Sequence, residues 1–110
     1  MINWARVSEL RDEVGVEDFD EVVELFLEEV DEAIAALRDL RDLSVLEPQC
    51  HFLKGSAVNI EFRDFANLCQ AGEAAAAAGQ GADVDIAVLV QSYPEAREVF
   101  INQSAERLAA

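Results

Sequence analysis

Periodicity along the chain predicts an all-α protein, an antiparallel four-helix bundle with a short N-terminal cap helix. Apolar residues recur every three or four positions through most of the 110 residues, which is the spacing of one helix face. The alternation typical of β-strands is almost absent. Turn signals are few and no repeat or flexible linker interrupts the pattern, so we expect a single domain over residues 1–110.

The first two expected helices meet at Gly15. Asn3 is a typical helix N-cap and glycine a typical C-terminal residue, so a short helix should run from Asn3 to the residue before Gly15. Asp18 or Asp20 should then begin a longer helix that reaches about Leu40. The apolar stripe of this longer helix is Phe19, Val22, Val23, Phe26, Leu27, Val30, Ile34, Leu37 and Leu40, and acidic residues fill its opposite, solvated face.

A third helix is expected after a connector that spans residues 42–47. Pro48 fits the first turn of a helix, where its missing N–H costs least. On a wheel of about 100° per residue, five apolar positions of this helix fall within one narrow arc. These predicted core positions are Leu46, Cys50, Leu53, Ala57 and Ile60.

Two further helices complete the prediction. The fourth should begin near Phe62 or Asp64 and run through the alanine-rich stretch to the turn at residues 79–81. We expect Asp83 to cap the last helix and Pro94 to kink or split it. The apolar stripe of the last helix is Ile86, Leu89, Val90, Tyr93, Val99, Phe100 and possibly Leu108.

Charge and composition exclude several classes of function. Twenty-three acidic and eight basic residues give a formal charge of −15, which would repel nucleic acid and anionic lipid and favours a neutral or basic protein partner. No apolar run approaches the roughly 20 residues of a membrane span. The first six residues lack the features of a signal peptide, so we expect a cytoplasmic protein.

The two cysteines do not indicate a metal site. Cys50 and Cys69 lie nineteen residues apart with no CxxC pair, and His51 is the single histidine. A structural zinc ion needs about four nitrogen or sulfur ligands, so we expect no bound metal. In the cytosol both thiols should be reduced and buried.

The outer face of the third helix carries the candidate site. His51, Lys54, Gly55, Val58 and, if the helix extends so far, Phe62 fall on an arc roughly 150° from the core stripe. A neutral imidazole has a free lone pair, a lysine can offset phosphoryl charge, and a glycine leaves room for a partner. Val58 and Phe62 would supply an apolar docking patch. A solvent-facing histidine with no chemical role explains the same residues equally well.

The stretch His51-x-Leu53-Lys54-Gly55-Ser56-Ala57-x-Asn59-Ile60 resembles the signature of histidine-containing phosphotransfer (HPt) domains, helical bundle modules of two-component phosphorelays. Residues 65–73 are similar to the next helix of that family, and residues 25–29 resemble its long second helix. The sequence departs from the family at Glu61, where a glycine is common. This departure concerns the turn between two helices rather than the histidine.

The resemblance implies a relay. His51 would accept a phosphoryl group on its distal ring nitrogen from a receiver-domain aspartate and pass it to a second receiver domain. Lys54 would stabilise the phosphoryl charge, and Gly55 would give the partner access. The expected partners are the receiver domains of hybrid histidine kinases and response regulators, which would bring the Mg²⁺ ion. We expect no cofactor on this chain.

Two other interpretations remain open at the level of sequence. The chain has no Gly-rich phosphate loop, so we expect a carrier and not an ATP-dependent kinase. The main alternative is a helical adaptor that binds a receiver or kinase domain without accepting phosphate. A hydrolytic enzyme fits poorly, because a convex helix makes a poor pocket. We expect a free-standing monomer.

Overall fold

A computed structural model describes residues 2–108, and within this range the protein is all-helical. The five α-helices are α1 (Trp4–Val14), α2 (Val16–Arg38), α3 (Leu46–Asn59), α4 (Arg63–Ala77) and α5 (Ile86–Arg107). Short 3₁₀ turns, Leu43–Val45 and Gly81–Asp83, precede α3 and α5. No strand occurs in this range, and an isolated bridge joins Ile2 to Phe62. The prediction of an all-α fold is confirmed.

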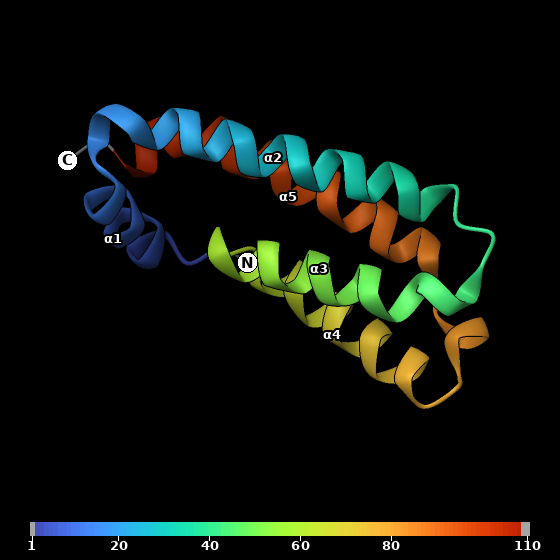
Figure 1. Cartoon of the computed structure of the whole chain (residues 1–110). Coiled ribbons are helices and arrows are strands. Elements are labelled where there is room, and N and C mark those ends of the chain that lie inside the picture. Colours follow the sequence, from blue (N-terminus) through green and yellow to red (C-terminus); the bar gives the residue numbers. More distant parts are fainter. Residues whose placement is uncertain (1, 109–110) are drawn as a thin grey trace.

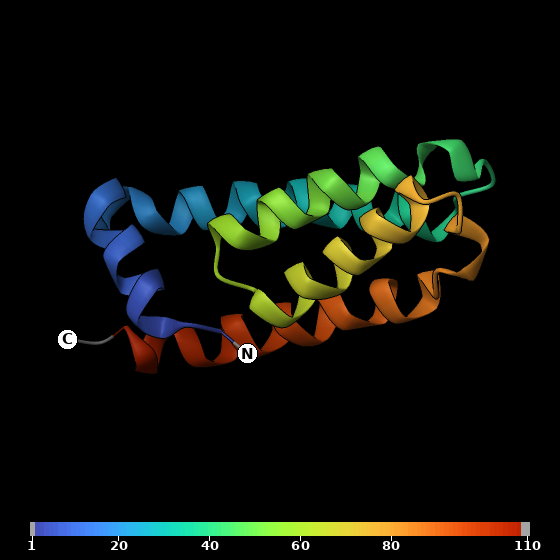
Figure 2. The same cartoon turned by 90° about the horizontal axis from the view of Figure 1, so that it is seen from below.

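Four long helices lie side by side, and α1 lies across one end of them (Figure 1). Successive helices from α2 to α5 run in alternating directions along a molecule of 46 × 21 × 20 Å (Figures 1 and 2). The most extensive helix contact is between α3 and α4, and α2 packs on α5. The outer surfaces of α3 and α4 therefore face away from the α2–α5 pair.

The boundary between α1 and α2 lies at Gly15, as predicted. The Asn3 side chain accepts a hydrogen bond from the Arg6 backbone N–H, and Gly15 follows the last residue of α1. The start of α2 was expected at Asp18 or Asp20, but the helix begins at Val16. Gly15 has φ +103°, and its carbonyl accepts hydrogen bonds from the N–H groups of residues 18 and 19. One glycine therefore ends α1 and begins α2 without a side-chain cap.

The last helix differs from expectation at its cap, and it is continuous through Pro94. The cap is Asp85, whose carboxylate accepts a hydrogen bond from the Val88 backbone N–H, whereas Asp83 lies in the preceding 3₁₀ turn. α5 is not split at Pro94 but continues to Arg107. The residue before the proline is anchored, because the buried Tyr93 hydroxyl donates a hydrogen bond to the Leu27 carbonyl of α2. This contact holds α5 against α2 where a backbone hydrogen bond is missing.

The core joins the predicted stripes of all the long helices. The predicted stripe of α3 is buried throughout, while Val99 of the α5 stripe is 42% exposed. An aromatic cluster fills the end near α1, with ring centroids 5.4 to 6.2 Å apart. Its members are Trp4, Phe62, Phe65, Tyr93 and Phe100.

Both cysteines are free thiols in the core, as predicted. Burial raises the pKa of the Cys69 thiol to about 12, with a smaller contribution from Cys50, and burial also raises the pKa of Cys50. Neither thiol is therefore activated as a nucleophile. None of the helices in residues 2–108 has both the length and the apolar character needed to cross a membrane.

Phe62 lies in the core and not in an exposed docking patch. α3 ends at Asn59, and Glu61 then adopts a left-handed conformation with φ +63°. This turn directs Phe62 inward, where it is 2% exposed and packs against Tyr93 and Phe100. The expectation that Phe62 shares the outer arc of His51 is therefore wrong, because the helix stops before it.

Glu61 should be a site of backbone strain. Its carboxylate lies 3.1 Å from Arg63 and 3.7 Å from Arg6, so replacing it loses ion pairs as well as changing the backbone. A comparison of Glu61→Gly with Glu61→Ala isolates the backbone, because both variants lose the pairs. We expect the glycine variant to be the more stable by about 1 kcal/mol, since only glycine adopts this φ without steric cost. Urea unfolding measures the difference, and an equal or greater stability of the alanine variant would contradict it.

Candidate functional site

α3 presents His51 on its outer surface because its apolar stripe packs inward. The His51 side chain is 68% exposed, and Val58, two turns further on, is 55% exposed. At Gly55 an added Cβ would meet no atom within 4 Å, so the space beside the imidazole is open. Lys54 lies on the flank of the same face and is 27% exposed. The structure thus brings together four of the five predicted site residues.

Glu73 of α4 completes the cluster. One of its carboxylate oxygens, Oε2, lies 3.0 Å from His51 Nδ1, and the other, Oε1, lies 2.7 Å from Lys54 Nζ. The three-residue spacing of His51 and Lys54 puts both on the side of α3 that faces α4. The extensive α3–α4 contact then brings in a carboxylate 22 residues further along the chain.

The environment of Glu73 favours its ionised form. Hydrogen bonds hold the pKa of this carboxyl below its usual value, with Lys54 contributing most and His51 second. An ionised carboxylate can only accept a hydrogen bond, so His51 Nδ1 carries the proton in this contact. In the neutral ring the lone pair then resides on Nε2, the nitrogen distal to the backbone. The pair therefore defines a tautomer suited to nucleophilic attack through Nε2.

A second aromatic residue lies beside the histidine on the outer face of α3. Phe52 is 46% exposed and precedes Gly55 by three residues, which places it one turn away. Sequence reasoning missed it, although a large apolar side chain outside the core stripe is a usable signal. Phe52 and Val58 flank the open space at Gly55. They are the exposed apolar pair on this face, where the sequence predicted Val58 and Phe62.

The site residues line none of three cavities in the molecule. Three cavities of about 720, 610 and 260 Å³ are lined by other residues. Within residues 2–108, no group of three or more His, Cys, Asp and Glu side chains could hold a metal ion.

The fold and the exposed His51 together place the protein among helical bundles that carry a histidine on an outer helix face. The Hpt domain family model matches residues 21–110, and the chain belongs to this family. Hpt domains are phosphotransfer carriers rather than kinases, and they interact with receiver domains in two-component phosphorelays. In the same comparisons, no curated protein and no solved structure matches the chain.

The contacts of Glu73 predict a specific pH dependence of stability. Because its pKa is depressed in the folded state, Glu73 stabilises the fold above its unfolded-state pKa, and this contribution is lost as pH falls through the folded-state pKa. Glu73→Gln cannot titrate. The difference in unfolding free energy between parent and variant should therefore shrink as pH falls below about 5.

Urea unfolding at a series of pH values measures this difference. Glu98→Gln is the matched control, because Glu98 is exposed and has no ion pair within residues 2–108. The difference between parent and Glu98→Gln should stay flat across the same range. A flat difference for Glu73→Gln as well would remove the argument that its carboxylate is held ionised.

Proposed function

We propose that His51 Nε2 accepts a phosphoryl group from a receiver-domain aspartate and passes it to a second receiver domain. The observation that supports this proposal is the contact of Glu73 with Nδ1 of a side chain that is 68% exposed, because a proton on Nδ1 puts the lone pair of the neutral ring on Nε2. We take residues 1–110 as one domain, with α2–α5 as an antiparallel four-helix bundle and α1 as its cap. The carrier acts as a cytoplasmic monomer.

The transfer is a displacement at phosphorus. The Nε2 lone pair forms the P–N bond while the P–O bond to the aspartate breaks, and the aspartate leaves as a carboxylate. The ring keeps its Nδ1 proton and gains positive charge, which the ionised Glu73 offsets. In the second transfer a carboxylate oxygen attacks phosphorus, and the P–N electrons return to Nε2. Such a reaction depends mainly on alignment and charge stabilisation, and the receiver supplies the Mg²⁺ ion.

Lys54 has donors to spare for the phosphoryl group. Its ammonium carries three N–H donors, and the contact with Glu73 Oε1 at 2.7 Å uses one of them. An incoming phosphoryl group on the neighbouring imidazole can accept another. Glu73 therefore keeps Lys54 close to the reacting ring before the partner arrives.

The partner docks over the open space at Gly55. A Cβ there meets nothing, and the exposed Phe52 and Val58 offer apolar contacts on either side. Receiver domains must bring an aspartate to within bonding distance of the imidazole, so the absence of a side chain one turn from His51 favours close approach. Phe52 takes the docking role that Phe62, buried in the core, does not have.

The relay is tested by transfer from a phosphorylated receiver domain. The parent protein should acquire an acid-labile label and lose it to a second receiver, while His51→Gln should acquire none. Lys54→Ala should transfer more slowly with unchanged helix content. Labelling of His51→Gln at the parent rate would overturn the proposal. Receiver binding without any label on the parent would instead support the adaptor interpretation.

Substitutions at Gly55 test the access of the partner to His51 separately from the stability of the fold. Gly55→Ala should raise the unfolding free energy by about 1 kcal/mol, because an exposed helical glycine is a weak helix former and the site is open. Gly55→Leu should also fold but lose transfer through steric obstruction. Ala87→Leu also adds bulk at an exposed position, on α5 and outside the site, and should transfer normally. Parent transfer rates in Gly55→Leu would remove the access argument.

A further inference from the structure

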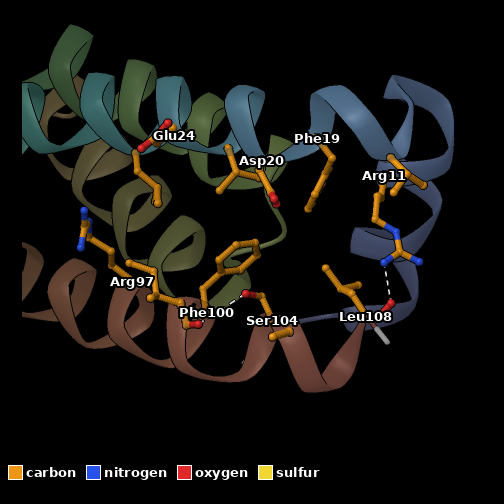
Figure 3. Close-up of a pocket in the computed structure, with 13 residues that line it drawn as sticks. Arg11, Phe19, Asp20, Glu24, Arg97, Phe100, Ser104 and Leu108 are labelled. Atoms are coloured by element: carbon orange, nitrogen blue, oxygen red, sulfur yellow. Dashed lines mark hydrogen bonds between the residues drawn. The ribbon is translucent and has the colours of Figure 1, made fainter. Parts of the chain in front are cut away.

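A long groove lies on the opposite side of the bundle from His51. It has a volume of about 720 Å³ and is lined by residues of α1, α2 and α5, with Leu108, which directly follows α5, at one end (Figure 3). None of its lining residues belongs to α3 or α4. A molecule bound in the groove would therefore leave the outer face of α3 uncovered (Figure 1).

The groove has apolar walls that the fold does not cover. Phe19 and Phe100 form its buried base, and Val16 and Ile101 stand on opposite walls with exposed fractions of 65% and 47%. Large apolar side chains that rim a groove in this way are typical of a docking surface. The lining of α2 extends from Val16 to Leu27, about 16 Å or three helical turns.

The α2 wall of the groove carries unpaired negative charge. Of the two arginines that line the groove, Arg97 pairs with Asp31 at 3.4 Å, whereas Arg11 donates a hydrogen bond to the neutral Leu108 carbonyl and keeps its positive charge at the α1 end. Asp20 and Glu24, one turn apart on the α2 wall, have no hydrogen-bond or ion-pair partner for their side chains within residues 2–108 (Figure 3). The occupant that complements this groove is apolar on one side and cationic beside it.

The groove depends on residues outside the family match. The match begins at residue 21, whereas Arg11, Val16, Phe19 and Asp20 precede it. Part of the lining of the groove therefore lies outside the matched region.

We propose that the groove between α1, α2 and α5 binds a short amphipathic helix of a partner protein, with basic side chains beside Asp20 and Glu24. Three turns of such a helix match the length of the groove, and apolar residues at i, i+3, i+4 and i+7 would contact its walls. A second copy of this chain is a poor occupant, because each copy carries a charge of −15. The docked helix tethers the carrier while the His51 face stays free for a receiver.

The probe is a fluorescein-labelled peptide of about 15 residues with Leu at the apolar positions and Lys elsewhere, measured by anisotropy against the full chain. Ile101→Lys should weaken its binding at least tenfold. Val88→Lys should not weaken it more than twofold. Both substitutions replace a valine or isoleucine of similar exposure on α5 and change the net charge equally, but Val88 lies outside the groove.

A second pair of variants tests how much the acidic side chains of the groove contribute to peptide binding. Asp20→Asn with Glu24→Gln should weaken binding several-fold, whereas Glu28→Gln with Glu32→Gln, at the same spacing on exposed positions of α2, should not. Equal effects within either pair would mean general attraction to an acidic protein and would overturn the proposal. So would undiminished binding of a control peptide with Ser in place of Leu. Concentration-dependent dimerisation that Ile101→Lys abolishes would assign the groove to a second copy and also overturn it.

Discussion

The site depends on one carboxylate held between two helices. Glu73 reaches from α4 to His51 Nδ1 and Lys54 Nζ on α3, and it can do so because these helices form the most extensive contact in the molecule. The rest of the exposed face of α3 could not hold the imidazole in a fixed orientation. This face is open at Gly55, and the side chains that flank the opening, Phe52 and Val58, are apolar. The carboxylate orients the ring, selects its tautomer and retains the lysine in a single arrangement.

The same packing fixes the orientation of α3 in the bundle but leaves the residues of its outer face free to vary. Its core stripe is fully buried, so the helix cannot rotate without exposing residues such as Cys50 and Leu53. The outer face consequently has a fixed direction, although it contributes little to the core. A mid-helix glycine costs about 1 kcal/mol relative to alanine, and the protein accepts this cost where no neighbouring atom requires the space. This is the pattern expected where access for a partner takes precedence over local stability.

Much of the fold could be predicted from sequence because it follows from periodicity. The apolar stripe of α3, the caps at Asn3 and Gly15, and the exposed His51 all follow from local spacing. The errors arose where local rules compete. Gly15 begins α2 as well as ending α1, and Asp85 rather than Asp83 caps α5 because a 3₁₀ turn intervenes. Element boundaries of this kind depend on backbone conformations that several residues could adopt.

The candidate site was only partly predictable for a different reason. Spacing within one helix brings His51, Lys54 and Gly55 together, and this part needed no tertiary information. The contact with Glu73 joins residues 22 positions apart on two helices, and the spacing within one helix does not show which residue of α4 lies beside His51. Phe62 was misplaced because the wheel was extended past the end of α3, where Glu61 reverses the direction of the chain.

The distribution of charge connects the two faces of the molecule. On the His51 face, the charge of Glu73 is offset by Lys54 and its other oxygen contacts His51, so His51 lies in a locally balanced environment within a protein of net charge −15. On the opposite face Asp20 and Glu24 stay unpaired beside an apolar groove. A phosphoryl group brings negative charge and would be repelled by carboxylates without partners, whereas a basic helix would be attracted by them. The pairing of carboxylates, more than their number, therefore decides which kind of ligand each face suits.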